Sequence, residues 1–362
     1  MEHPENDKQY SGLQVNAGVE QPPMVNPYLR RRRRPQLSAA DYVEGILKGN
    51  TTVLGQAVTL VESLNPAHQA VAQEVIEKCL PFSGHSRRIG ITGVPGAGKS
   101  TSIDAFGIHI LKRGGKLAVL AIDPSSERSR GSILGDKTRM ERLAVHPKAF
   151  IRPSPSAGSL GGVARKTRET IVLCEAAGYD TVFVETVGVG QSETAVHSMV
   201  DFFLLIQVAG TGDELQGIKR GIMEMADGIV VNKADGDNVD RANLAATQFR
   251  NALHLFPLGP SGWSPEVLTY SGYFDLNIDK VWEMIDRYFE HVKRSGYFDE
   301  KRRQQEKYWM YETINEQLKS HFYNNPEIER LLEQKQQMVL RNEQSSFTAA
   351  ADVLSRYFAL PH

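Results

Sequence analysis

The chain has 362 residues, 41% of them hydrophobic and 23% charged, with a formal net charge of −1. This composition is ordinary for a globular protein, and the near-neutral charge gives no general attraction to nucleic acid or acidic membranes. No stretch approaches the roughly 18 apolar residues of a membrane span, and the first residues have no signal-peptide or transit-peptide character. The two cysteines, Cys79 and Cys174, are too few for a disulfide framework. We therefore expect a cytoplasmic protein that contacts neither membranes nor nucleic acid.

The amino-terminal part of the chain divides into a tail and a helical segment. Residues 1–36 are polar and contain several prolines, which predicts a disordered tail. Its five consecutive arginines at 30–34 have no aromatic residues between them, so we interpret them as a solvated charged stretch, with an anion or nucleic-acid contact as the alternative. Residues 37–84 have helical apolar spacing. Ser38 can cap a first helix, a second is expected over 56–63, and a third from Pro66.

A glycine-rich stretch after the first apolar strand has the full pattern of a phosphate-binding loop. Gly93 is followed by four residues and then by Gly98, Lys99 and Ser100. Glycines permit a tight turn and leave the backbone amides open to an anion, which also faces the start of the next helix. Lys99 adds a positive charge for the outer phosphates, and the Ser100 hydroxyl can ligate Mg²⁺. The motif assigns nucleotide binding to Gly93, Val94, Pro95, Gly96, Ala97, Gly98, Lys99, Ser100 and Thr101.

Strands and helices then alternate regularly along the chain. Apolar strands are predicted over 116–122, 150–151, 180–186, 201–208, 228–232 and 267–270, and helices over 162–177, 213–226 and 238–253. Such alternation is typical of an α/β fold with a mostly parallel sheet flanked by helices. We assign residues 85–280 to this nucleotide-binding domain.

The strand at 228–232 ends in the tetrapeptide Asn232-Lys233-Ala234-Asp235, the guanine-reading pattern of GTPases. A carboxylate at Asp235 can accept hydrogen bonds from both the ring N–H and the exocyclic amine of guanine, a donor pair that adenine lacks. After the last strand, Ser271, Gly272 and Tyr273 stand where GTPases place a short Ser-Ala contact to the guanine oxygen, although Gly272 replaces the usual alanine. The predicted domain is therefore a P-loop GTPase. The base-binding residues are Asn232, Lys233, Asp235, Ser271, Gly272 and Tyr273.

Acidic residues near the loop are candidates for the metal site and for catalysis. Glu185 begins Glu-Thr-Val-Gly, where most GTPases have an Asp-x-x-Gly acid that reaches Mg²⁺ through water. Asp123 ends a strand and Asp136 lies in the polar loop after it, although each could instead cap a turn or a helix. Val189, where fast GTPases often carry a water-orienting glutamine, predicts slow intrinsic hydrolysis. The predicted metal ligands are Ser100, Asp123, Asp136 and Glu185, and the predicted catalytic residues are Lys99, Asp136 and Glu185.

The pattern becomes entirely helical past residue 281. Helices are predicted near 279–294, 299–322, 326–341 and 346–358. Trp282, Ile285, Tyr288 and Phe289 form one apolar stripe that must be buried against something. We assign residues 281–362 to a dimerisation arm, with packing of these helices on their own domain as the alternative.

Several long motifs together resemble the MeaB/ArgK family of GTPases. They lie at 93–101, 121–126, 131–140, 185–193, 212–219 and 232–235, and the resemblance extends over about residues 38–358. It implies a homodimeric G-protein chaperone of adenosylcobalamin-dependent methylmalonyl-CoA mutase, which uses GTP binding and hydrolysis to gate cofactor delivery and to protect or reactivate the mutase. It also implies binding of GTP or GDP with Mg²⁺, an additional switch at 209–219, and a dimer arm in the carboxyl-terminal helices.

Other functions remain open at this stage. A metallochaperone GTPase of nickel-enzyme maturation would need a histidine- or cysteine-rich tract, whereas the ten histidines are scattered. A signalling GTPase would bind an effector that is not a cobalamin enzyme. A related adenosylcobalamin-dependent acyl-CoA mutase is an alternative client.

Overall fold

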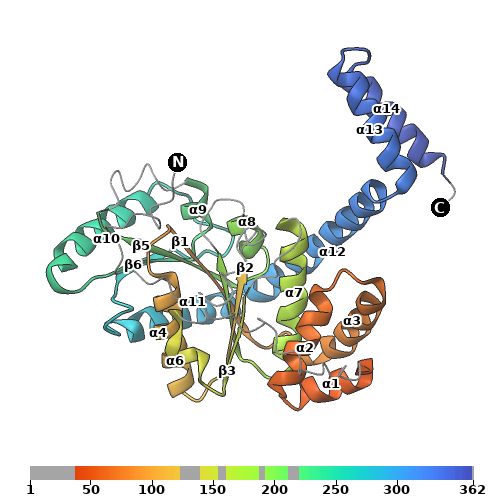
Figure 1. Ribbon diagram of the computed structural model, residues 1–362. Helices are drawn as coiled ribbons and strands as arrows, with labels where there is room; N and C mark the ends of the chain where they lie inside the picture. Colours follow the sequence, from red (N-terminus) through yellow and green to blue (C-terminus); the bar gives the residue numbers. More distant parts are fainter. Residues whose placement is uncertain (1–36, 123–138, 154–159, 187–191, 211–219, 361–362) are drawn as a thin grey trace, which may run out of the picture. The chain divides into compact units, whose positions relative to one another are not determined.

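The computed structural model describes residues 37–122, 139–153, 160–186, 192–210 and 220–360 (Figure 1). Within these ranges seven strands form one parallel sheet in the order β3-β2-β4-β1-β5-β6-β7. The predicted α/β fold with a parallel sheet flanked by helices is confirmed. The strands are β1 (Arg87–Gly93), β2 (Leu117–Ile122), β3 (Ala149–Arg152), β4 (Thr181–Thr186), β5 (Phe202–Val208), β6 (Gly228–Asn232) and β7 (Glu266–Thr269).

The strands are nearly continuous apolar runs because helices cover both faces of the sheet. On one face, Ile89 and Ile91 of β1 belong to a core shared with α4 (Lys99–Lys112) and α11 (Ile278–Arg294). On the other face, Val231 of β6 packs in a core with α9 (Arg220–Met225) and α10 (Val239–Leu253). β1 lies between β4 and β5, so its carboxyl end is at the crevice where open parallel sheets bind ligands.

Three helices precede the sheet, as predicted. Ser38 caps the first of them, because its hydroxyl accepts the backbone N–H of Asp41 (3.2 Å). The second begins at Thr51 rather than at residue 56, because Asn50 Oδ1 accepts the N–H groups of Thr52 (3.0 Å) and Val53. The three are α1 (Ala39–Leu47), α2 (Thr51–Glu62) and α3 (Pro66–Cys79).

Among the described ranges, the helices after β2 follow the predicted spans except for two short ones, for which no span was predicted. These additional helices are α6 (Glu141–Ala144) and α8 (Ser192–His197). Of the helix expected over 213–226, only α9 lies in the described ranges. The others are α7 (Leu160–Ala176), α12 (Tyr297–Tyr323), α13 (Pro326–Leu340) and α14 (Ser346–Phe358).

Helix α11 packs against the sheet and is not part of the predicted dimerisation arm. Its stripe of Trp282, Ile285, Tyr288 and Phe289, which we expected at a dimer contact, lies in the core beneath β1, β4 and β5. Each of these side chains is at most 5% exposed. The apolar face of the sheet in the same chain therefore buries this stripe, and no second chain is needed to cover it.

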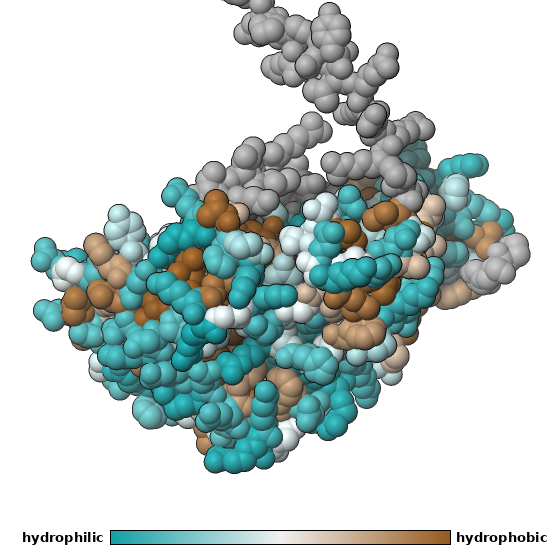
Figure 2. All heavy atoms as spheres, turned by 90° about the horizontal axis from the view of Figure 1, so that it is seen from below, coloured by the Kyte–Doolittle hydropathy of each residue, from teal (hydrophilic) through white to brown (hydrophobic). Residues whose placement is uncertain are grey.

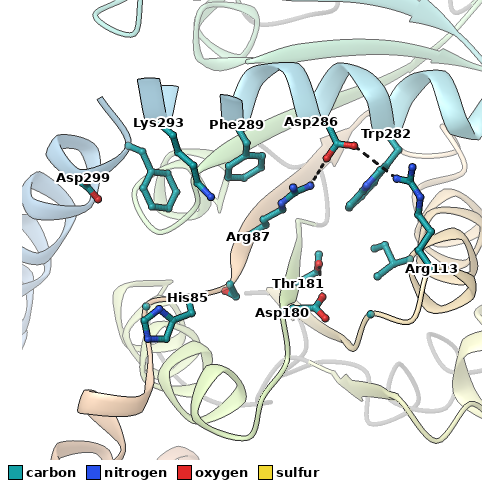
Figure 3. A pocket seen from close by; sticks show the side chains of 15 residues that line it. His85, Arg87, Arg113, Asp180, Thr181, Trp282, Asp286, Phe289, Lys293 and Asp299 are labelled. Carbon is teal, nitrogen blue, oxygen red and sulfur yellow. Dashed lines mark hydrogen bonds and ion pairs between the residues drawn. The ribbon is translucent and has the colours of Figure 1, made fainter. Parts of the chain in front are cut away.

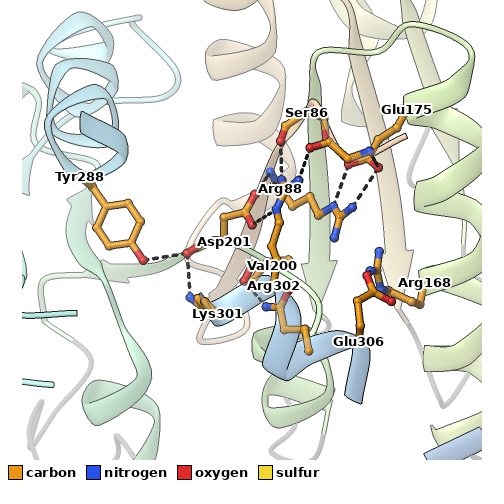
Figure 4. Close-up of polar contacts among 12 residues, drawn as sticks. Ser86, Arg88, Arg168, Glu175, Val200, Asp201, Tyr288, Lys301, Arg302 and Glu306 are labelled. Carbon is orange, nitrogen blue, oxygen red and sulfur yellow. Dashed lines mark hydrogen bonds and ion pairs between the residues drawn. The ribbon is translucent and has the colours of Figure 1, made fainter. Parts of the chain in front are cut away.

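Helix α12 is bonded at its start to the segment that connects α8 to β5. Arg302 donates to both carboxylate oxygens of Asp201 (2.9 and 2.8 Å), as Figure 4 shows in part. Two turns further on, Trp309 Nε1 donates to the carbonyl oxygen of Ser198 (3.1 Å). The rest of the helix is open to solvent on one side. Its exposed apolar side chains include Tyr308, Met310, Tyr311, Ile314, Leu318 and Tyr323.

On the face shown in Figure 2, apolar residues form separate groups among hydrophilic ones. No helix within the described ranges is both long and apolar enough to cross a membrane.

An ion pair lies buried where β1 meets α7. Arg88 and Glu175 have side chains only 3% and 1% exposed, and the guanidinium donates to both carboxylate oxygens (2.7 and 2.9 Å; Figure 4). Ser86 Oγ and the backbone N–H of Gly84 donate to the same carboxylate. Burial disfavours the charged form, but these hydrogen bonds and the charge of Arg88 outweigh it and lower the pKa of Glu175 to about 2.

Glu175→Ala should cost about 3–5 kcal/mol of unfolding free energy, because it leaves the buried Arg88 charge without its partner. Urea denaturation at pH 7 measures this loss. Glu44→Ala is the matched control, since the pair of Glu44 with Lys48 is exposed and should change stability little. Equal stability of the two variants would contradict the prediction.

The lowered pKa of Glu175 also predicts how this contribution to stability changes with pH. The stabilisation by ionised Glu175 is fully present above its ordinary pKa of 4.5 and is lost as the pH falls toward 2. The stability difference between the natural chain and Glu175→Ala should therefore shrink as the pH falls below 4.5.

Candidate nucleotide-binding site

The phosphate loop leaves β1 at Gly93 in a conformation that only glycines allow. A Cβ at Gly93 would lie far inside contact distance of the carbonyl oxygen of Ile206 on β5. Gly96 and Gly98 have φ of +81° and +85°, and a Cβ at Gly98 would be 2.6 Å from Asn232 Nδ2. Helix α4 begins directly after Gly98, so its first N–H groups point at the loop. This is the geometry of an anion-binding turn.

Lys99 extends back over this loop. Its ammonium donates to the carbonyl oxygen of Gly93 (2.9 Å). Burial lowers the pKa of Lys99, while the negative charges of Glu185 and Glu193 act in the opposite direction. A partly buried ammonium of this kind is stabilised by a further anion beside it. Glu193 is itself buried, in the first turn of α8, and the sequence analysis gave it no individual role.

Ser100 and Glu185 bring two hard oxygen donors to the same edge of the sheet. The strand register sets Glu185 opposite Ile91 of β1, and the Ser100 hydroxyl lies 3.5 Å from Glu185 Oε1. A hydroxyl and a carboxylate are ligands that Mg²⁺ accepts, so these two residues fit that ion and would hold it beside the phosphate loop. The other two predicted acids, Asp123 and Asp136, lie outside the described residues, as do Val189 and the stretches 124–136 and 211–219.

The asparagine of the base-reading tetrapeptide connects two loops through hydrogen bonds. Asn232 is buried at the end of β6, where its Nδ2 donates to the carbonyl oxygen of Ala97 (2.8 Å). Its Oδ1 accepts the backbone N–H of Gly272 (3.0 Å). The phosphate loop and the segment after β7 are therefore held together through one side chain. Lys233 follows with a positive φ of 61° that turns the chain out of the strand.

Asp235 is oriented by Ser271. The Ser271 hydroxyl donates to Asp235 Oδ2 (2.6 Å), which leaves the remaining lone pairs of the carboxylate for the base. The sequence predicts for residues 271–273 only a contact to the guanine oxygen, so this side-chain contact to Asp235 is an addition. An alanine at position 272 would fit tightly, because a Cβ there would lie 3.2 Å from Ser102 Oγ and 3.3 Å from its Cα. Tyr273 is largely exposed beside this segment.

Sequence reasoning missed the side chains that hold the site together. Thr186 at the end of β4 donates to the Thr92 hydroxyl of β1 (2.8 Å). Tyr270 and Ser102, both buried, are joined by a hydrogen bond of 2.6 Å. Thr186 lies within the Glu-Thr-Val-Gly motif and Ser102 follows directly after the phosphate loop, but neither motif assigned a role to these side chains. Thr92 and Tyr270 belong to no recognisable short motif.

A hollow elsewhere in the molecule does not mark the nucleotide site. A cavity of about 830 Å³ lies among Arg87, Arg113, Thr181, Trp282 and Asp286 (Figure 3). Arg87 and Thr181 begin β1 and β4, whereas the phosphate loop follows the other end of β1. The two places are about 20 Å apart, given a rise of roughly 3.3 Å per residue.

The parallel sheet, the phosphate loop at the end of its central strand and the carboxylate after β6 together define a GTPase of the P-loop class. Comparison with known protein families identifies the family within this class. Residues 54–327 match the family described as methylmalonyl Co-A mutase-associated GTPase MeaB. The chain belongs to the MeaB family, and the resemblance noted in the sequence is confirmed.

Individual relatives agree with this assignment. The chain is 45% identical over 313 residues to the GTPase ArgK of Escherichia coli, covering 86% of this chain and 95% of ArgK. It is 42% identical over 328 residues to the mitochondrial methylmalonic aciduria type A homolog of Mus musculus, covering 88% and 79% of the two chains. A crystal structure titled LAO/AO transport system kinase is similar with a TM-score of 0.71 and 38% identity, covering 89% of this chain and 98% of that one.

Proposed function

We propose that this protein is a GTP-hydrolysing chaperone that gates adenosylcobalamin loading and protects or reactivates methylmalonyl-CoA mutase. The observation that carries the proposal is the match of residues 54–327 to a family described as associated with that mutase. The same match favours the mutase over a nickel-enzyme client. A related adenosylcobalamin-dependent acyl-CoA mutase remains the alternative client.

The proposed binding mode follows from the positions of the side chains. The loop amides and Lys99 hold the phosphates, and Asp235 accepts the two donors of guanine. Ser100 and Glu185, with Asp123 and Asp136, would hold Mg²⁺. That ion would neutralise phosphate charge as the terminal phosphate leaves.

We expect the protein to hydrolyse GTP slowly by itself. Val189 cannot orient an attacking water. Faster hydrolysis therefore requires another segment or a partner that positions this water. The stretch 209–219 is the proposed switch that signals to the mutase.

A homodimer in the cytoplasm is the proposed assembly, formed through the carboxyl-terminal helices. The support is apolar surface that the described chain leaves uncovered. On α12 the exposed Tyr311, Ile314 and Leu318 follow the spacing of a helix-pairing seam. On α14 the exposed residues include Phe347, Leu354 and Phe358. Because α11 packs on its own sheet, the proposed arm consists of α12 to α14.

The test is a GTPase assay of the purified protein with and without methylmalonyl-CoA mutase from the same source. Slow hydrolysis alone and clear acceleration by the mutase would support the proposal. Rapid hydrolysis alone, or an unchanged rate with the mutase, would contradict the chaperone role while leaving the GTPase assignment intact. A parallel assay with a related adenosylcobalamin-dependent mutase would decide between the clients.

A further inference from the structure

Tyr270 is bonded to both the base-reading loop and the helix that follows the phosphate loop, although it belongs to no recognised motif. It follows β7 directly and is fully buried. Its backbone N–H donates to the carbonyl oxygen of Val231 (3.0 Å), and its carbonyl oxygen accepts the N–H of Ala234 (3.0 Å). These two bonds bracket Asn232 and Lys233, so the backbone of Tyr270 fixes the start of the base-reading loop.

The side chain of Tyr270 points to the other half of the site. Its ring stacks on Phe106 of α4, with centroids 5.4 Å apart and planes at 24°. Its hydroxyl lies 2.6 Å from Ser102 Oγ, which in turn lies 2.8 Å from the carbonyl oxygen of Gly98. A carbonyl oxygen can only accept, so the single proton of Ser102 goes to Gly98 and Tyr270 donates to Ser102. Burial raises the pKa of Tyr270, so it keeps this proton at neutral pH.

The chain of donors therefore ends on one peptide bond of the phosphate loop. The Gly98 carbonyl shares its peptide with the N–H of Lys99, the first N–H of α4. Hydrogen bonds in a chain polarise one another, and a donor on the carbonyl makes the N–H of the same peptide a stronger donor. The same carbonyl oxygen accepts the backbone N–H of Ser102 (2.9 Å), so the Ser102 hydroxyl is a second donor to it.

We propose that Tyr270 is a positioning residue for nucleotide phosphate, acting through Ser102 on the Gly98–Lys99 peptide while its backbone holds the base-reading loop. The proposal rests on the nucleotide-binding role of the loop and not on the mutase as partner.

The first test is Tyr270→Phe, which keeps the ring on Phe106 and removes only the hydroxyl. Its affinity for GDP, measured by isothermal titration calorimetry, should fall about 2- to 10-fold, the effect of one hydrogen bond. The ratio of GDP to IDP affinity should stay unchanged, because IDP differs from GDP only in lacking the exocyclic amine. A loss of affinity with a changed ratio would overturn the proposal, since the damage would then lie in base reading.

A double-mutant cycle distinguishes an effect of Tyr270 that passes through Ser102 from a general loss of packing around the site. In a Ser102→Ala background, Tyr270→Phe should have no further effect on GDP affinity, because its route to Gly98 is already cut. Additive losses would contradict the relay. If Tyr270→Phe does not fold, Ser102→Ala alone still tests the bond to Gly98, and unchanged GDP affinity in that variant would overturn the proposal.

Tyr288→Phe is the matched control. It also removes a buried tyrosine hydroxyl, which donates to the carbonyl oxygen of Asp201 (2.8 Å), but it lies on α11 away from the loop. Its GDP affinity should equal that of the natural chain, and an equal loss in both tyrosine variants would contradict the proposal. Absence of GDP binding by the natural chain would instead contradict the nucleotide site itself.

Discussion

Lys99→Ala should lose GTP hydrolysis by a factor of about 100 or more. The Lys99 ammonium lies over the phosphate loop, 2.9 Å from the Gly93 carbonyl oxygen, and it supplies the mobile positive charge for the outer phosphates. Removing one preorganised charge or donor at developing negative charge typically costs 10²- to 10³-fold in rate. Single-turnover hydrolysis at saturating GTP measures the effect apart from any loss of affinity.

Lys112→Ala provides the comparison for that experiment. Lys112 ends the same helix and is exposed, so its removal takes the same charge from α4 without touching the loop. Its rate should match that of the natural chain. Similar losses in both variants would show that net charge, and not the position of Lys99, controls the reaction.

Asp235→Asn should reverse the base preference from GTP toward XTP. The Ser271 hydroxyl donates to Asp235 Oδ2 at 2.6 Å, so an asparagine here would give its oxygen to Ser271 and its amide N–H₂ to the base. Guanine presents donors at that position and would be repelled, whereas xanthine presents a carbonyl oxygen in place of the amine. Two hydrogen bonds to a charged group are lost, which predicts about a 100-fold weaker affinity for GTP.

Competition binding with GDP and XDP measures this change directly. Asp237→Asn is the control, because Asp237 is an exposed acid two positions along the chain and should leave the preference for guanine intact. A preference for GDP retained by Asp235→Asn would contradict the assignment of the base-reading carboxylate. Loss of binding to both nucleotides would point to a collapsed loop.

Local patterns in the sequence determined most of the fold and the centre of the site. Apolar runs of strand length marked all seven strands within a few residues, because strands buried on both faces need apolar side chains throughout. The glycines around Lys99 and the tetrapeptide ending at Asp235 marked the ends of β1 and β6, because each motif has its chemistry within a few consecutive residues.

Tertiary structure alone decided which surfaces those elements share. The stripe on α11 has the same spacing whether a sheet or a second chain covers it, and only the fold placed it on β1, β4 and β5. Tyr270 and Ser102 are separated by 168 positions, so no local pattern could pair their hydroxyls. Likewise, Asn232 carries a guanine-site motif, but its bonds to Ala97 and Gly272 appear only when the strand ends meet. Periodicity and motifs are properties of neighbours in sequence, whereas burial and hydrogen bonding between distant segments exist only once the chain has folded.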